Sequence, residues 1–216
     1  MAISKANFNS FNVTPTASKL ITFNSSNDGL AADDVGGSLV LISTQTASSS
    51  STISFTSGLD STYKEYIFKF INIHAATLNS QFHFQVSTDG GSSYGVTATT
   101  TNFISAHNEA GNSTALAYQT GYDLAQSTSY SLITGENGTE NDESSSGTLH
   151  LFDPSNTTFV KHFISRHQQY TSGDYSYDNY SAGYFNTTSA INAIDFKMSS
   201  GNIDSGVIKM YGLSKS

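Results

Sequence analysis

The segment Tyr63–Ile73 constrains the fold of this 216-residue chain more than any other stretch. Tyr66, Phe68 and Phe70 occupy one set of alternating positions. Ile67, Ile71 and Ile73 occupy the other set, with Lys69 as the charged exception among them. A strand that is apolar on both faces is predicted to be central in its sheet and covered on both sides. We therefore expect this segment to organise the core.

The following segment, Gln81–Val86, alternates strictly between apolar and polar residues. This pattern predicts a strand with one face in the core and one face toward water. Asp89, Gly90 and Gly91 come next, and glycine accommodates the positive φ angles of a tight turn. The stretch Tyr63–Tyr94 is thus predicted to form two long antiparallel strands and the start of a third.

Short strand candidates recur along the rest of the chain, at intervals of roughly 8–12 residues. Clusters of Gly, Asn, Asp and Ser separate them, and only the region near residues 108–117 is a candidate for a helical turn. This pattern predicts an all-β fold, a jelly-roll-like antiparallel β-sandwich. Besides the two segments above, predicted strands lie at Ser38–Thr44, Ser51–Thr56, Val96–Phe103, Ala115–Gln119, Ser129–Thr134, Thr148–Phe152, Thr158–Arg166, Ser181–Phe185, Ala190–Met198 and Gly206–Tyr211.

Residues 1–36 differ from the rest of the chain. Their hydrophobic residues are sparse and are separated by polar residues and by Pro15. This composition predicts an extended arm or a short strand pair that leads into the domain. We therefore divide the chain into an N-terminal anchoring arm, residues 1–36, and a β-sandwich domain, residues 37–216.

Composition limits the possible partners. The net charge is −8, and the nine Lys and Arg residues are scattered singly, which disfavours binding to nucleic acid or to an anionic membrane surface. No apolar run of about 18 residues is present, so no membrane insertion is expected. The N-terminus lacks the apolar region of a secretory signal, and we expect synthesis in a cytoplasm. The chain has no cysteine, which excludes disulfides, thiolate metal sites and cysteine nucleophiles.

Few residues suggest metal binding or catalysis. The six histidines lack metal-ligand spacing such as HxH or HExxH, and no cofactor is expected. The acidic segment 136–143 offers Glu140, Asp142 and Glu143 as weak Ca²⁺ candidates, but it lacks EF-hand spacing, and a solvated loop is the expected structure. A GxSxG motif is absent, and no pair of carboxylates stands out among the 17 acidic residues. We therefore expect no enzymatic activity.

Residues 170–184, with the sequence YTSGDYSYDNYSAGY, form the most informative predicted loop. The mixture of Tyr, Ser, Gly, Asp and Asn is typical of adaptable binding loops, in which tyrosine offers rigid, amphipathic contact area. The alternative is that the tyrosines pack on a neighbouring subunit or line a sheet edge. The residues predicted to contact a glycan or a partner are Tyr175, Tyr177, Asp178, Tyr180 and Tyr184.

The segment Thr158–Arg166 repeats the two-faced pattern, with Phe159 and Phe163 on one face. A sandwich strand buries only one face, so the second apolar face of each such strand would be an exposed patch. A like subunit is the simplest cover, which predicts a homo-oligomer with closed rotational symmetry. The residues of this predicted patch are Ile67, Ile71, Ile73, Val160 and Ile164.

Three segments of the chain, SGLDSTYKEYIFKFINIHAAT, FQVSTDGGSSY and AINAIDFKMSSGNIDSGVIKMYGLS, carry a resemblance to a known group. They resemble a β-sandwich module of virion proteins from marine tailed phages, cyanophage-type structural proteins in particular, from about Ser38 to the C-terminus. The resemblance implies a non-enzymatic structural protein located in the virion, as a tail fibre or adhesin or as capsid decoration. It also implies other virion proteins and host-surface carbohydrate as partners, and a trimer. The alternative is a carbohydrate-binding module of a secreted or cell-surface protein.

Overall fold

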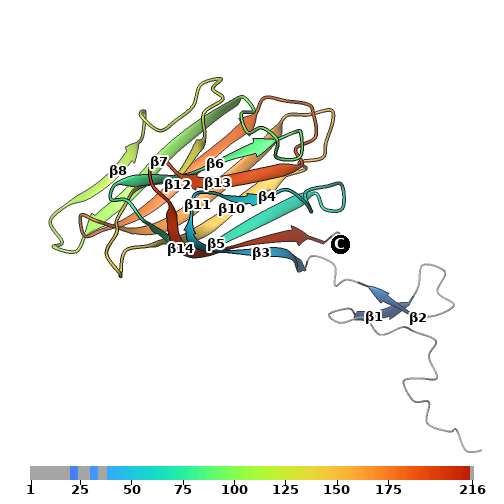
Figure 1. Ribbon diagram of the computed structural model, residues 1–216, viewed down its shortest axis with the longest axis horizontal. Coiled ribbons are helices and arrows are strands. Elements are labelled where there is room, and N and C mark those ends of the chain that lie inside the picture. Colours follow the sequence, from blue (N-terminus) through green and yellow to red (C-terminus); the bar gives the residue numbers. More distant parts are fainter. Residues whose placement is uncertain (1–19, 24–29, 34–37, 215–216) are drawn as a thin grey trace, which may run out of the picture. The chain divides into compact units, whose positions relative to one another are not determined.

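The computed structural model describes residues 20–23, 30–33 and 38–214, and these ranges contain strands and turns but no helix (Figure 1). None of these residues therefore belongs to a helix that is long and apolar enough to cross a membrane. The chain divides into two compact units, residues 1–40 with 214–216, and residues 41–213. In the first unit, β1 (Leu20–Phe23) and β2 (Leu30–Asp33) form an antiparallel pair, one of the two structures predicted for the arm. The rest of the predicted arm lies outside the described residues.

Eight strands of the β-sandwich have the connectivity of a jelly roll. They lie in one 12-stranded sheet, in two four-stranded runs ordered β3-β14-β5-β10 and β4-β13-β6-β9 that are joined through β11 (Lys161–Thr171), and most successive strands lie in opposite runs. This is the strand order of a double Greek key, and the nearly closed antiparallel sheet confirms the predicted all-β, sandwich-like fold. The strands are β3 (Leu39–Ser50), β4 (Ile53–Phe55), β5 (Glu65–Ala75), β6 (Ser80–Ser87), β9 (Ser131–Asn137), β10 (Ser145–Phe152), β13 (Ala193–Met198) and β14 (Ile203–Leu213).

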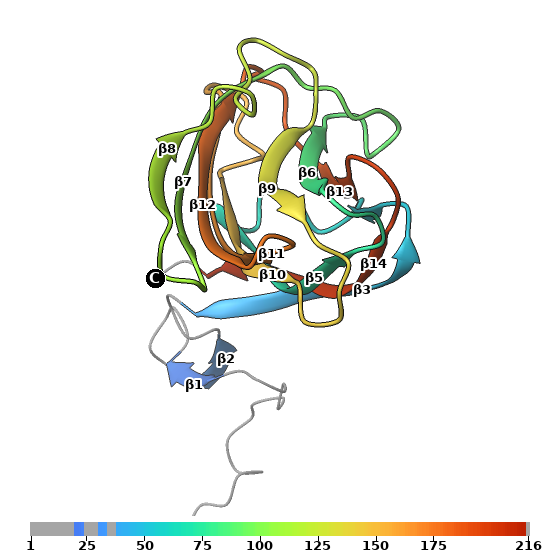
Figure 2. The same cartoon turned by 90° about the vertical axis from the view of Figure 1, so that its left-hand side faces the viewer.

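Two inserted hairpins extend the first run beyond β10. One is β11 with β12 (Tyr175–Phe185), and the other is β7 (Ala98–Asn108) with β8 (Thr114–Tyr118). The order at this side is β10-β11-β12-β7-β8. Figure 2 shows the extended sheet bending so that its inner face turns toward β9, β6 and β13. The region near residues 108–117, the candidate for a helical turn, instead contains the turn of the β7–β8 hairpin and most of β8.

Strands that follow one another in the sequence are not always neighbours in a sheet. β5 pairs with β10 and β14, whereas β6 pairs with β9 and β13, so the prediction that they form an antiparallel pair is wrong. The chain instead crosses between the two runs, and Phe70 meets Phe82 across the interior with ring centroids 5.6 Å apart. The predicted positive φ angles after β6 are confirmed, at 74° for Gly90 and 88° for Gly91.

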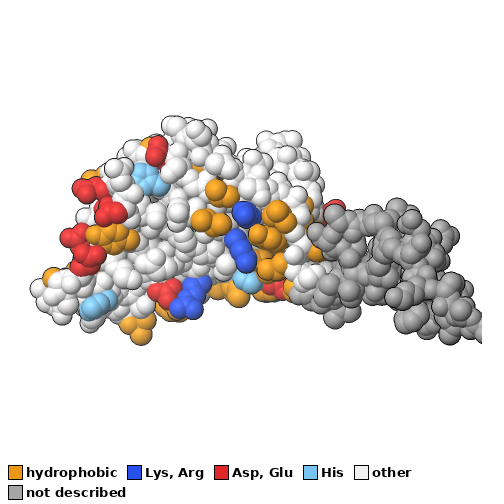
Figure 3. Space-filling model, turned by 90° about the horizontal axis from the view of Figure 1, so that it is seen from below, with side chains coloured by type: hydrophobic (Ala, Val, Ile, Leu, Met, Phe, Trp, Pro, Cys, Tyr) orange, Lys and Arg blue, Asp and Glu red, His pale blue; other side chains and the backbone are white. Residues whose placement is uncertain are grey.

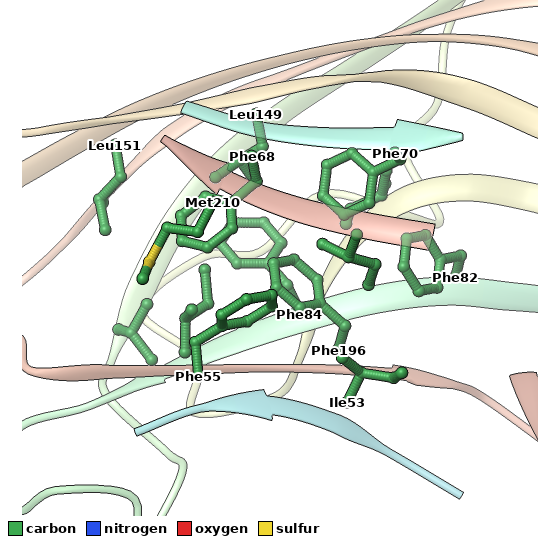
Figure 4. Close-up of a cluster of buried hydrophobic side chains, with 14 of the residues drawn as sticks. Ile53, Phe55, Phe68, Phe70, Phe82, Phe84, Leu149, Leu151, Phe196 and Met210 are labelled. Carbon is green, nitrogen blue, oxygen red and sulfur yellow. The ribbon is translucent and has the colours of Figure 1, made fainter. Parts of the chain in front are cut away.

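The core fills the space between β5 and β14 on one side and β6, β13 and β4 on the other (Figure 4). The prediction that β5 is central and that Phe68 and Phe70 are buried is confirmed, since their exposed fractions are 0% and 2%. Phe196 lies at the centre of an aromatic cluster, with ring centroids 5.2–6.4 Å from five other phenylalanines. These are Phe55, Phe68, Phe70, Phe82 and Phe84.

The prediction of strands that are apolar on both faces is wrong for two reasons. In β5 a bulge at Asn72, with φ of 50°, changes the phase of the strand and turns Ile73 into the core. Of the outward isoleucines of β5, Ile67 is buried and Ile71 remains 42% exposed. The other strand, β11, begins only at Lys161, after Phe159 and Val160, and from there it alternates between buried and exposed residues. Ile164 is its one exposed aliphatic residue.

A second part of the interior, where β7, β12 and β11 face inward, is polar. Asn102, Ser181 and Ser165 form one cross-strand row, and His167 follows on β11. All four are buried, and no hydrogen-bond partner within the described residues reaches their side chains. The His167 ring packs against Phe70 at 4.8 Å between centroids. Burial lowers the pKa of His167 to about 3, so its imidazole is neutral near pH 7.

Candidate functional site

The tyrosine-rich segment is mainly a strand and not the predicted loop. Only the turn 172–174 lies between strands, and β12 pairs along its whole length with β11 on one side and β7 on the other. Alternate side chains of β12 therefore point to opposite faces of the sheet. Asp178, Tyr180 and Tyr184 lie on the outer face, whereas Tyr175 and Tyr177 have the parity of the buried Asn179 and Ser181. The pleat thus brings three of the five predicted residues together and separates the other two from them.

Of the three outer residues, Tyr184 lines a smaller groove and Asp178 is hydrogen-bonded to Tyr180. Tyr180 itself lines a groove on the outer face of β7, β12, β11 and β10. Its volume is about 450 Å³, and its lining includes Phe103, Tyr180, Arg166, Ile164 and His150. Two neighbouring grooves, of about 380 and 580 Å³, continue it past Tyr184 and His162. The groove of about 380 Å³ shares three lining residues with the first groove and one with the groove of about 580 Å³. We call the first groove, of about 450 Å³, the outer-face groove; its volume is in the range of small-ligand sites.

One side of the groove is formed by Phe103, Tyr180 and Arg166, which lie in one cross-strand row on β7, β12 and β11 and which we call the aromatic wall. The rings of Phe103 and Tyr180 stack with centroids 4.5 Å apart and an interplanar angle of 4°. The Arg166 guanidinium carbon lies 5.1 Å from the centroid of Tyr180, a cation–π arrangement. The wall therefore presents flat apolar surface beside a charged donor.

Hydrogen bonds hold the aromatic wall in place. Asp178 accepts hydrogen bonds from Arg166, at 3.1 Å from Nε and 2.6 Å from Nη2, and from the Tyr180 hydroxyl at 2.9 Å. The hydrogen bond from Arg166 lowers the pKa of the Asp178 carboxyl. The hydrogen bond to Asp178 raises the pKa of the Tyr180 phenol. These contacts orient the rings and leave part of the guanidinium toward solvent.

The floor of the groove is the next outward row of side chains, of which Thr101 and Ala182 are small. Thr101, Ala182, Ile164 and His150 occupy the next outward row on β7, β12, β11 and β10. On β10, His150 Nδ1 lies 2.6 Å from Glu65 Oε1, so the imidazole is held at one end of the floor. The outer-face groove thus combines an aromatic platform, a partly apolar floor and fixed polar groups, an arrangement suited to binding a polar ligand that has apolar faces.

The predicted Ca²⁺ candidates are not gathered into a site. Glu143 is buried, and its Oε2 accepts a hydrogen bond from the backbone N–H of Glu140 at 2.6 Å. Its carboxylate also lies against Gly138, where a Cβ would be only 2.0 Å from it. Among the residues that the structure describes, no three His, Asp or Glu side chains are arranged to hold a metal ion. The Glu143 carboxylate therefore stabilises its own turn. The side chains of Glu140 and Asp142 do not combine with it into a metal site.

Of the residues that line the groove, sequence reasoning assigned only Tyr180 to a binding site; Phe103, Ile164, Arg166 and His150 are among those it missed. The alternation of His162, Ile164 and Arg166 along β11 is a local signal for an outward face. No local signal places Phe103 beside Tyr180, because β7 and β12 pair across a long stretch of chain. Comparison of the chain with protein-family models, with curated proteins and with solved structures finds no match.

Proposed function

We propose that the chain is a non-enzymatic structural protein of a tailed-phage virion, anchored by its N-terminal arm, that contacts host-surface glycans through the outer-face groove. The stacked Phe103 and Tyr180 rings beside Arg166 carry the glycan part of this proposal. A sugar ring has apolar C–H faces that pack on aromatic rings, and hydroxyl groups that pair with Asp178 and Arg166. A rigid aromatic surface beside fixed hydrogen-bonding groups meets both requirements.

The virion part of the proposal is supported by the resemblance and by the fold. The segments that resemble phage virion proteins include β5, β13, β14 and the second half of β6, all of them strands of the jelly roll. Jelly rolls occur in viral capsid proteins and in lectins, so the architecture suits both a structural and a glycan-contacting role. Tail-fibre or adhesin and capsid-decoration locations both fit these observations. Because fold alone does not imply function, the groove is stronger support for glycan contact than the jelly-roll fold is.

The second candidate is a carbohydrate-binding module of a secreted or cell-surface protein. The same groove supports this candidate, because a glycan site of this kind does not depend on the protein being part of a virion. Phage structural genes on both sides of this gene would support the first candidate. An upstream export signal or a catalytic domain in the same reading frame would support the second.

Glycan binding is tested by screening the full-length protein on an array of bacterial and algal polysaccharides and by measuring affinities for those retained. Tyr180→Ala removes half of the stack and is expected to weaken binding roughly tenfold, the effect of losing about 1.4 kcal/mol. Tyr175→Ala removes a tyrosine from the other face of β12 and is the matched control, expected to bind as the parent does. Absence of any glycan binding, or equal losses for both variants, would contradict the role of the groove.

A further inference from the structure

The aromatic wall continues into a row of basic side chains. Arg166 of β11, Lys69 of β5 and Lys209 of β14 occupy one outward cross-strand row, with Thr148 of β10 between Arg166 and Lys69. Neighbouring strands lie about 4.8 Å apart, so the two lysines are about 5 Å apart at the backbone and Arg166 is about 10 Å from Lys69. Figure 3 shows basic and hydrophobic side chains adjoining near the middle of this face. We call these three residues the cationic row.

Basic residues are scarce in this chain, which makes their grouping informative. The sequence has nine Lys and Arg against 17 Asp and Glu. Six of the nine lie in the described ranges, and three of these six form the cationic row. Acidic side chains gather instead toward one end of the face seen in Figure 3. The local charge of the row is thus opposite to the net charge of the protein.

The two lysines lack partners that would neutralise them. Lys69 Nζ lies 5.4 Å from the centroid of the Tyr211 ring, and within the described ranges no carboxylate is within ion-pair distance of Lys69 or Lys209. They are also direct register partners. Like charges directly opposite each other on neighbouring strands destabilise a sheet. An anionic group placed between them would remove this repulsion.

We propose that this face binds an acidic polysaccharide, whose sugar rings pack on the aromatic wall and whose carboxylate, sulfate or phosphate groups pair with the cationic row. This inference rests on the proposed glycan contact and adds the charge class of the glycan. The spacing of the cations suits a polymer that repeats its negative charge at every one or two sugar residues. An extended nucleic acid duplex would also meet the acidic remainder of the surface, which disfavours it.

The test measures affinity of the full-length protein for alginate, for dextran sulfate and for neutral dextran, at 50 and 500 mM NaCl. In the double variant Lys69→Gln/Lys209→Gln, affinity for at least one acidic polymer should fall tenfold or more. The matched control, Lys64→Gln/Lys197→Gln, changes the net charge equally but leaves the cationic row intact, and it should bind within twofold of the parent. Without ligand, the first double variant should melt no lower than the parent, because a repulsion is lost.

Three results would overturn the proposal. Equal binding of acidic polymers by the parent and Lys69→Gln/Lys209→Gln, together with groove-dependent binding of neutral glycans, would refute charge specificity and leave the proposed function standing. No binding of any polysaccharide would refute both. Tighter binding to duplex DNA or to phosphatidylserine vesicles than to either acidic polymer would assign the row to another class of partner. Selective binding of alginate or of dextran sulfate supports the proposal and identifies the anionic group.

Discussion

Phe103 and Tyr180 stack face to face on neighbouring strands, with centroids 4.5 Å apart and ring planes 4° from parallel. Phe103 is still 40% exposed, so the pair stabilises the sheet surface while presenting it to a ligand. A double-mutant cycle of Phe103→Ala and Tyr180→Ala should give a coupling energy of about 0.5–1.5 kcal/mol in urea denaturation. Additive effects within about 0.3 kcal/mol would show that the rings do not support each other.

The aromatic core sets the stability of the sandwich. Phe68 is fully buried and lies 5.5 Å, between centroids, from both Phe55 and Phe196. Phe68→Ala should therefore lower the free energy of unfolding by about 3–5 kcal/mol in chemical denaturation. Phe159→Ala deletes a phenylalanine that is 68% exposed and should change it by less than about 1 kcal/mol. A parent-like melting temperature for Phe68→Ala would contradict the central position of β5.

The buried His167 should make the fold sensitive to acid. Its folded pKa is lowered to about 3 from the ordinary value of 6.5, so the unfolded chain binds more protons between these two values. The contribution of the neutral His167 ring to the free energy of unfolding is therefore complete above pH 6.5 and is lost as the pH falls toward 3. At pH 5 this residue alone lowers the free energy of unfolding by about 2 kcal/mol. His83, whose pKa is lowered to about 4 by burial and by Lys197, adds a loss of the same sign.

The measurement is the free energy of unfolding at pH 7 and at pH 5. His167→Gln removes the titrating group, so the difference between the two pH values should shrink by about 2 kcal/mol, whatever the absolute stability of the variant. His162→Gln is the control, because it removes an imidazole from the exposed face of the same strand. It should leave the difference between the two pH values nearly unchanged. An unchanged pH difference in His167→Gln would mean that the buried ring is not the source of the acid sensitivity.

The N-terminal arm should serve attachment more than folding. The core residues that the structure describes lie beyond residue 40, in the unit 41–213. Deletion of residues 1–36 is therefore expected to leave the circular dichroism spectrum of the sandwich unchanged. Its melting temperature should stay within a degree or two of that of the parent. The same deletion should abolish incorporation into the particle or the oligomer. A truncated protein that fails to fold would show that the arm completes the core.

Self-association, a further part of the proposal, should involve the sheet edge at β8. In the part of the chain that the structure describes, β8 pairs only with β7, and its Leu116 is 79% exposed. An uncharged, apolar edge strand favours pairing with another chain. Light scattering should give a mass well above 23.1 kDa, with a trimer expected from the resemblance, and Leu116→Lys should reduce it. Leu78→Lys, at a turn, is the control, and a parent monomer at micromolar concentration would contradict association.

The amino-acid sequence by itself determined the local features of this fold. Period-two alternation identified most strands and the burial of Phe68 and Phe70, because the side chains of a strand point alternately to two faces whatever its partners are. Gly90 and Gly91 marked a turn because glycine has no Cβ to oppose positive φ. No long segment has hydrophobic residues spaced at the 3.6-residue period of a helix, and this local pattern excluded a fold built from helices.

Only the tertiary structure decided which strands pair and which faces of the sheet are exposed to solvent. The crossing of β5 and β6 between the two runs, the phase change at Asn72 and the separation of Tyr175 from Tyr180 all depend on pairing with strands distant in the sequence. The candidate site has the same origin, because its rows cross strands from β7 to β14. Register and partner choice are set by the energy of the whole sheet, and no local pattern contains that information.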